Sequence, residues 1–311
     1  MRAWQAGAAA LAAAGYASAV VRRNRGLRPP PVRDAEGRPL PARPFAFSDG
    51  ERVSVIDAGA GPPILWVPGA DGVKETFRYQ LPAFAADYRV IAPDMRARFP
   101  ADASFNLLVD DLAELLSDRQ PGPAVVVGQS LGGSIAIRFA TRFPELVRGL
   151  VLANTLTRVS YEHLGLNRTA LVPIAIGTTR YLPTGLARRL ARFWCRESVW
   201  IYDPAGCHDL TEYALWTGPR TVPPRISSRR VGLLKGLDLR PELVRIAAPT
   251  LVVKGPLDVY CPPSWAREIA ERIPGARYEE LEGTGHCSHI SMPEAFNSVV
   301  EAWLREILAG R

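Results

Sequence analysis

The stretch VVVGQSLGGS places one serine, Ser130, between small residues. Gly128 and Gly132 frame it as Gly-x-Ser-x-Gly, with valines before it and a segment of helical spacing after it. This context is typical of a strand that turns sharply into a helix and exposes a serine hydroxyl on a strained backbone. The motif also occurs by chance in loops. Ser130 therefore needs a base to take its proton and a carboxylate to orient that base.

Two later segments supply such groups. The apolar stretch 250–253 runs into Lys254-Gly-Pro-Leu-Asp258, and a carboxylate just beyond a strand lies at the sheet edge where ligands bind. His286 ends Gly283-Thr-Gly-His286, a loop of small residues before the last helix. Serine, then acid, then histidine is the chain order of hydrolases that carry this type of serine turn.

Short apolar strands alternate with helices on both sides of a long insertion. We expect strands at 52–56, 64–67, 89–92, 125–127, 147–153, 250–253 and 277–281, and helices at 73–85, 107–116, 134–140, 264–272 and 293–308. This alternation predicts right-handed crossovers and a mainly parallel central sheet flanked by helices, which is an α/β fold.

Residues 154–245 interrupt the alternation and predict an inserted, mostly helical cap over the carboxyl edge of the sheet. Its aromatic residues either roof an apolar pocket or form the core of the insertion itself. They are Trp194, Trp200, Tyr202, Tyr213 and Trp216. As a group, they favour a hydrophobic substrate.

The chain resembles the α/β-hydrolase superfamily over residues 45–153 and 246–308. The resemblance rests on four segments in order: VIAPDMR (90–96), VVVGQSLGG (125–133), APTLVVKGPLD (248–258) and GTGHCSHISMPEAFN (283–297). It implies an α/β-hydrolase core over 45–153 and 246–311. It also implies Ser130 as nucleophile, His286 as base and Asp258 as orienting acid.

The family usually carries His-Gly after the third strand, where the next backbone N–H forms half of the oxyanion hole. This sequence has VPGADG, with Pro68 in place of the histidine. The resemblance implies that the backbone N–H groups of Ala70 and Leu131 donate to the oxyanion. We expect Pro68 to stiffen this turn, since proline fixes φ. Asp71 would lie close to the developing negative charge unless it points away.

Other polar residues near these motifs fit the chemistry less well. The family usually uses the aspartate at the position of Asp94 structurally, and Asn154 cannot serve as the carboxylate. His289 is expected to pack against the last helix or to cap it, while His163 and His208 are expected at the surface of the insertion.

Composition limits the remaining classes of function. The chain has 311 residues, 47% hydrophobic and 22% charged, which suits one large core with an insertion. The net charge of +7 divides into +6 over residues 1–44, +7 over 154–245 and −6 over the core. The arginines are scattered and form no basic-aromatic motif, which predicts no nucleic-acid partner.

The cysteines carry no metal or disulfide signal. Cys195, Cys207, Cys261 and Cys287 show no Cys-x-x-Cys spacing, so neither a zinc site nor a disulfide framework is indicated. We expect reduced, mostly buried thiols, with a Cys195–Cys207 disulfide as the alternative. Serine catalysis of this kind also requires no metal or organic cofactor.

The N-terminal segment, residues 1–28, is rich in alanine. Ala3 to Val21 carries no charge and is followed by a basic cluster, Arg22-Arg23-Asn24-Arg25. Such a segment fits a membrane anchor with a cytoplasmic catalytic domain, a cleaved signal of a secreted protein, or the leader of a soluble protein. Residues 29–44 are rich in proline and predict an extended linker.

These observations together predict a serine hydrolase that cleaves esters of hydrophobic acyl or alkyl groups through an acyl-enzyme. Two other readings stay open. The same triad serves carbon–carbon bond hydrolases and cofactor-free haloperoxidases, and some members of the superfamily are ligand-binding or scaffold proteins.

Overall fold

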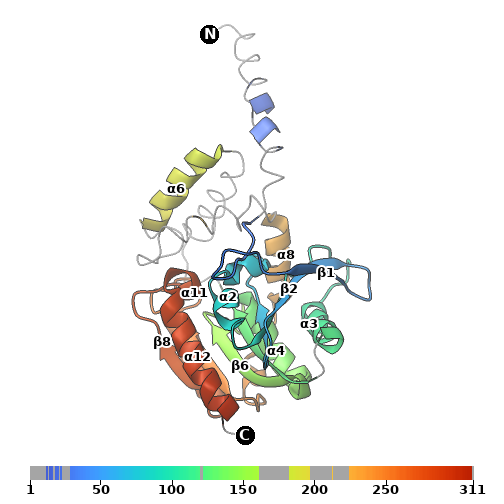
Figure 1. Cartoon of the computed structure of the whole chain (residues 1–311), viewed down its shortest axis with the longest axis vertical. Coiled ribbons are helices and arrows are strands. Elements are labelled where there is room, and N and C mark those ends of the chain that lie inside the picture. The colour runs from blue at the N-terminus through green and yellow to red at the C-terminus, as the bar shows by residue number, and fades with distance from the viewer. Residues whose placement is uncertain are drawn as a thin grey trace.

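The computed structural model describes residues 29–119, 122–160, 182–196 and 224–309, together with Glu212 and scattered positions between 12 and 22. At its centre lies an eight-stranded sheet with the order β1-β2-β4-β3-β5-β6-β7-β8 (Figure 1). The strands are β1 (Ala42–Ala46), β2 (Arg52–Ala58), β3 (Pro63–Val67), β4 (Arg89–Pro93), β5 (Ala124–Gln129), β6 (Val147–Ala153), β7 (Thr250–Lys254) and β8 (Arg277–Glu280).

The interior strands are buried on both faces because their sequences are almost wholly apolar. Every residue of β3, β5 and β7 is buried, as expected of parallel strands covered by helices on both sides. Among the described strands, the antiparallel pairs are β1 with β2 and β2 with β4, and the other pairs are parallel. Pro44 is tolerated in β1 because that strand lies at the sheet edge.

Two hydrophobic clusters hold the helices against the sheet. One face is covered by α2 (Gln80–Phe84) and α12 (Pro293–Ala309), and the other by α3 (Phe105–Arg119), α4 (Leu131–Arg142) and α10 (Pro263–Arg272). Shorter elements lie in the connections: η1 (Lys74–Phe77), η2 (Pro144–Leu146), α9 (Arg240–Leu243) and α11 (Ser288–Ser291). The mainly parallel α/β sandwich predicted from the sequence is confirmed.

The strand order brings the loop after β3 next to the turn after β5. The chain leaves β3 toward β4 on one side, whereas β5 pairs with β3 on the other side. The loop after β3 and the turn after β5 therefore emerge next to each other at the carboxyl edge, where the strand order reverses. Such a switch point is where open α/β sheets bind ligands.

Two sequence predictions for the N-terminal half are wrong in detail. The helix expected over 73–85 is split into η1 and α2, because Pro82 has no N–H to continue a helix through residue 78. Residues 29–44 are not a free linker. Val32 is buried in the core, Arg33 pairs with Pro39, and β1 already begins at Ala42.

The insertion contains α6 (Thr184–Arg196) and α8 (Pro224–Leu234) among its described residues. Near the end of the predicted insertion, Leu234, Leu239 and Leu243 are buried in the same cluster as the helices of the core. The aromatic residues expected to roof a pocket lie outside the described residues, and only the backbone of Trp194 is described.

The segment 3–21 also lies outside the described residues, apart from scattered positions. Within the described part of the chain, no helix combines the length and the apolar character needed to cross a bilayer.

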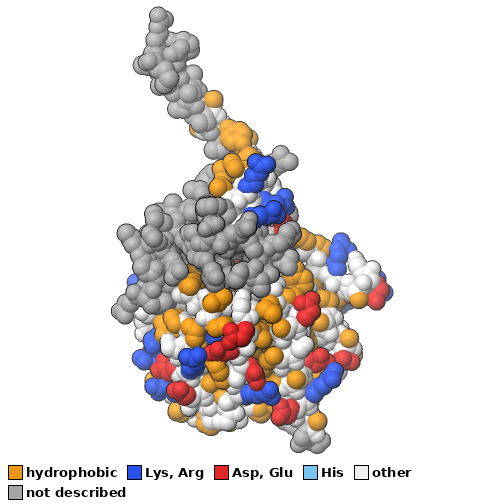
Figure 2. Space-filling model, turned by 90° about the vertical axis from the view of Figure 1, so that its left-hand side faces the viewer, with side chains coloured by type: hydrophobic (Ala, Val, Ile, Leu, Met, Phe, Trp, Pro, Cys, Tyr) orange, Lys and Arg blue, Asp and Glu red, His pale blue; other side chains and the backbone are white. Residues whose placement is uncertain are grey.

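Acidic and basic side chains are interspersed over the face of the core shown in Figure 2.

A buried arginine organises the loop that follows β4. The side chain of Arg96 is 2% exposed and donates through Nε and Nη2 to both carboxylate oxygens of Asp111 on α3, at 2.7 Å each. Its Nη1 donates to Asp49 at 2.7 Å. Arg98, two residues on, is 80% exposed and pairs with Glu51. The arginines of this loop thus differ sharply in burial.

We expect Arg96→Met to lower the free energy of unfolding by about 3–5 kcal/mol, because it leaves the Asp111 carboxylate without its buried cation. The matched control Arg98→Met should cost about 1 kcal/mol or less, since that guanidinium is in water and the Glu51 carboxylate keeps the backbone N–H groups of Ala97 and Arg98 as donors. Urea unfolding of the two variants and the parent tests this. Equal losses in both variants would show that Arg96 does not anchor the loop.

Candidate active site

Ser130 lies in a sharp turn between β5 and α4. Its backbone has φ 54° and ψ −122°, a conformation that residues other than glycine rarely adopt. The turn is possible because the residues two positions before and after Ser130, Gly128 and Gly132, have no side chain. A Cβ on Gly128 would come within 2.5 Å of the Gly132 carbonyl oxygen, and one on Gly132 within 2.2 Å of the Val67 oxygen. The strain is held by hydrogen bonds, since the Ser130 N–H donates to Ala153 O at 3.0 Å.

The structure brings Ser130, His286 and Asp258 into one chain of hydrogen bonds. His286 Nε2 is 3.0 Å from Ser130 Oγ, and His286 Nδ1 is 2.9 Å from Asp258 Oδ2. Gln129, next to the serine, donates to the backbone carbonyl of His286 at 3.2 Å. Both distances along the chain are within the range needed for proton transfer and for orientation of a base.

The loops that carry Asp258 and His286 are packed directly on each other. A Cβ on Gly255 would come within 2.2 Å of the Gly285 carbonyl oxygen. The Leu257 N–H donates to Thr284 O at 2.9 Å, and the Leu281 N–H donates to Lys254 O at 2.8 Å. Asp258 and His286 therefore share one rigid support at the ends of β7 and β8.

Asp258 is fully buried and yet ionised. Burial opposes the charge, but the neighbouring His286 and Lys254 outweigh it through their charges and hydrogen bonds, so that the pKa of Asp258 is lowered to about 2. Its Oδ1 accepts from the N–H groups of Tyr260 and Cys261, at 2.9 and 3.1 Å. Its Oδ2 accepts from Lys254 Nζ at 2.5 Å in addition to His286. All its acceptor positions are therefore in use.

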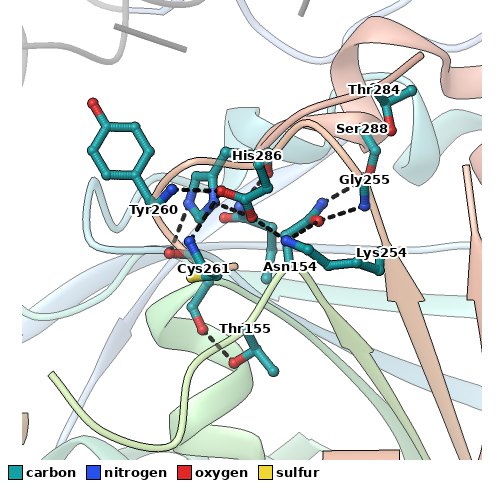
Figure 3. A network of polar contacts seen from close by, with 12 residues as sticks. Asn154, Thr155, Lys254, Gly255, Tyr260, Cys261, Thr284, His286 and Ser288 are labelled. Atoms are coloured by element: carbon teal, nitrogen blue, oxygen red, sulfur yellow. Dashed lines mark hydrogen bonds and ion pairs between the residues drawn. The ribbon is translucent and has the colours of Figure 1, made fainter. Parts of the chain in front are cut away.

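Lys254 extends this network to the next strand (Figure 3). Its ammonium group, which is fully buried, donates to Asn154 Oδ1 at 3.2 Å, and the Gly255 N–H donates to the same oxygen at 2.8 Å. Asn154 Nδ2 donates in turn to Ser288 Oγ at 2.8 Å. Asn154 is thus a structural link and not an acid, as predicted. The sequence reasoning missed Lys254, although a lysine closing an apolar strand signals a buried charge with a partner.

An apolar cavity of about 160 Å³ opens over Ser130 and His286. Ala70 and Leu131, the predicted oxyanion donors, both line it. Within the described part of the chain, the N–H groups of Ala70 and Leu131 donate to no other residue. Asp71 Oδ1 accepts from the Gly72 N–H at 2.9 Å, which ties the carboxylate to its own loop.

The alternative residues lie elsewhere. His289 is buried between Phe77 and Phe296, with Nε2 3.1 Å from Thr76 Oγ1. Burial, followed by the charges of His286 and Arg78, lowers its pKa to about 3, so it packs as a neutral ring. Asp94 accepts from the backbone N–H and the ammonium of Lys74 at 3.0 and 3.1–3.2 Å. His163 and His208 lie outside the described residues.

Asp258, Cys261 and His286 bring three potential metal donors within 4.8 Å of one another. The chemistry of these donors does not suit a metal ion. The carboxylate already accepts from Lys254, His286 and two backbone N–H groups, and burial raises the pKa of the Cys261 thiol well above its ordinary value. Cys261 and Cys287 are free, buried thiols, as predicted.

A sequence model of the alpha/beta hydrolase family matches residues 64–299. Among curated proteins, a protein of Mycobacterium tuberculosis named "Putative non-heme bromoperoxidase BpoC" is 31% identical over 267 residues, which cover 81% of this chain and 97% of that protein. The pimeloyl-[acyl-carrier protein] methyl ester esterase of Nitrosomonas europaea is 31% identical over 202 residues, which cover 62% of this chain and 76% of the esterase.

Solved structures share the fold. The crystal structure of BpoC superposes with a TM-score of 0.67 and 26% identity, covering 85% of this chain and 97% of that one. An esterase from Thermogutta terrifontis superposes with a TM-score of 0.66 and 24% identity, covering 86% of this chain and 99% of that one.

The buried pair of Asp258 and Lys254 can be tested by a double-mutant cycle. We expect Asp258→Asn at pH 7 to lower the free energy of unfolding by about 3–5 kcal/mol, since it leaves the buried Lys254 ammonium unpaired. The double variant Lys254→Met/Asp258→Asn should recover most of this loss. Additive losses in urea unfolding would contradict a direct pairing.

The same cycle has a pH signature. The folded pKa of Asp258 lies below its ordinary value, so its ionisation stabilises the fold above pH 4, and this contribution is lost as the pH falls toward 2. The stability advantage of the parent over the Asp258→Asn variant should therefore shrink between pH 4 and pH 2.

Proposed function

The chain belongs to the alpha/beta hydrolase family, and we propose that it is a serine hydrolase that cleaves esters of uncharged, apolar acyl groups. One observation carries the proposal. Ser130 Oγ, His286 and Asp258 are linked by hydrogen bonds of 3.0 and 2.9 Å, and the serine opens into an apolar cavity.

In the acylation step, His286 Nε2 accepts the hydroxyl proton of Ser130 while Oγ attacks the ester carbonyl. The carbonyl oxygen becomes negatively charged and receives hydrogen bonds from the N–H groups of Ala70 and Leu131. His286 then passes its proton to the leaving alcohol, and an acyl-Ser130 ester remains. In the second half, His286 activates a water molecule that releases the carboxylic acid and restores the hydroxyl.

Asp258 accepts the Nδ1–H of His286 throughout. It fixes the tautomer that leaves Nε2 free to accept a proton, and its negative charge stabilises the imidazolium that forms. The low pKa of Asp258 keeps the carboxylate charged across the pH range in which a histidine base works. No metal or organic cofactor enters these steps.

The lining of the cavity supports the choice of substrate. Leu156, Val159, Val231 and Trp265 supply apolar surface, and no lysine or arginine is among the described residues that line it. Burying a carboxylate there would cost several kcal/mol without a cationic partner. An uncharged acyl group fits this lining best.

The similarity to BpoC favours perhydrolysis as a second candidate, because its name describes a non-heme bromoperoxidase. Hydrogen peroxide in place of water would attack the acyl-Ser130 ester, giving a peracid and the free hydroxyl. The peracid would oxidise bromide to hypobromite and itself be reduced to the carboxylic acid. Bromination that requires both an acyl donor and Ser130 would support this reaction.

Replacing the nucleophile tests the proposal directly. We expect Ser130→Ala to lower kcat/KM for p-nitrophenyl butyrate by a factor on the order of 10⁴ or more, and to abolish labelling by a fluorophosphonate. Ser264→Ala, which changes an exposed serine outside the cavity, is the matched control and should behave as the parent.

The outcomes separate the alternatives. A parent that is labelled but turns over no ester points to the carbon–carbon bond hydrolases. A parent that is neither labelled nor active points to a ligand-binding or scaffold protein, and retained activity in Ser130→Ala would exclude Ser130 as nucleophile.

The apolar lining predicts a preference for neutral acyl groups. We expect kcat/KM to be about 10²-fold lower for mono-p-nitrophenyl adipate than for p-nitrophenyl hexanoate, which has an acyl chain of the same length without the carboxylate. Steady-state hydrolysis of both esters at pH 7.5 measures the ratio. Similar values would show that the acyl group meets a cation or water instead of this lining.

A further inference from the structure

A cap arginine contacts the oxyanion loop, residues 68–72, through the carbonyl groups of the loop. Arg230 on α8 is 2% exposed. Its Nη1 donates to the carbonyl oxygens of Ala70 and Asp71 at 3.1 and 2.6 Å. Its Nη2 donates to Met95 O and Arg96 O at 2.9 Å each, and Nε donates to Arg96 O at 3.2 Å.

The loop is shaped around this guanidinium group. Gly72 has a φ of +64°, and a Cβ there would come within 2.2 Å of Arg230 Nη1. The Met95 N–H donates to Gly72 O at 2.9 Å, so the loops after β3 and β4 are also bonded to each other. The guanidinium therefore fills the space between two loops whose carbonyl groups point toward it.

These contacts fix the residue whose N–H matters for catalysis. The Gly72 N–H donates to Gly69 O at 2.9 Å, which holds the peptide group that contains the Ala70 N–H. Arg230 holds the next peptide group through Ala70 O. Because the two peptide planes on either side of Ala70 are held, the direction of its N–H is set.

The guanidinium group of Arg230 is charged at neutral pH. Burial lowers its pKa to about 10, although the charges of Asp71 and Asp94 oppose the shift. At neutral pH it is a buried cation whose hydrogen bonds to backbone carbonyls are charge-assisted and strong. The next residue, Val231, lines the cavity, so α8 touches both the substrate site and the oxyanion loop.

We propose that Arg230 is a positioning residue of the oxyanion hole, which aims the Ala70 N–H at the transition state from within the cap. This inference rests on the proposed hydrolase function. In this chain Arg230 supplies a polar tether for a loop that begins with Pro68 where the family usually has a histidine.

Three variants test the proposal: Arg230→Met removes the donors, Arg230→Lys keeps the charge without the planar fork, and Arg229→Met changes the exposed neighbour as a control. Each is measured for hydrolysis of p-nitrophenyl butyrate, for thermal unfolding, and for inhibition by a trifluoromethyl ketone. The ketone adds to Ser130 and forms an oxyanion that requires the same donors as the transition state.

For Arg230→Met we expect kcat to fall on the order of 10²-fold with KM within about threefold of the parent, the effect of losing one oxyanion donor. The inhibition constant of the ketone should rise by a similar factor. Arg230→Lys should lie between, and Arg229→Met should match the parent.

Unchanged kcat in Arg230→Met, or a loss of kcat without weaker binding of the ketone, would overturn the proposal. If Arg230→Met does not fold, Arg230→Lys decides: parent-like kcat and ketone inhibition would overturn it. Failure of the proposed function is separate, because the parent itself would then show neither turnover nor fluorophosphonate labelling, and the role of Arg230 would fall with it.

Discussion

The contact between Gly132 and the end of β3 is the constraint on which the site depends. A single Cβ at Gly132 would meet the carbonyl oxygens of both Val67 and Pro68, at 2.2 and 2.5 Å. The first turn of α4 can therefore lie directly on the backbone that becomes the oxyanion loop. This contact puts Ser130 and the two proposed oxyanion donors, Ala70 and Leu131, on adjoining backbones, so their separation depends on packing and not on flexible side chains.

Asp258 and His286 are held by a network of buried hydrogen bonds and not by close backbone packing alone. Around Asp258, a lysine and two backbone N–H groups satisfy a charge that the interior would otherwise reject, and Asn154 in turn accepts a hydrogen bond from that lysine. These contacts hold the carboxylate independently of His286, and the carboxylate in turn orients the imidazole ring. The position of His286 Nε2 is therefore set by contacts that begin at the ends of the strands.

Much of this could be predicted from the sequence, because the signals are local. Valine runs identified the buried strands, and the small residues around Ser130 and before His286 identified turns with little space. Chain order then indicated which polar residues meet. The broken helix at 74–84 was missed although Pro82 signals the break locally, whereas the folded segment at 29–44 was missed because tertiary contacts such as the burial of Val32 decide it. Arg230 was missed for a related reason: in RISSRRVGLL nothing local separates it from Arg225 or Arg229, and only the position of α8 buries one and exposes the others.

The position of α8 also bears on how such an enzyme could be redesigned. The cap looks like an exchangeable module, since it enters and leaves the core between β6 and α9. A chimera that replaced residues 154–245 with the cap of a relative, in order to change substrate range, would also remove the guanidinium between the loops after β3 and β4. On the proposed role of Arg230, the unit to be grafted ends before α8, and recombination should preserve that helix together with the core.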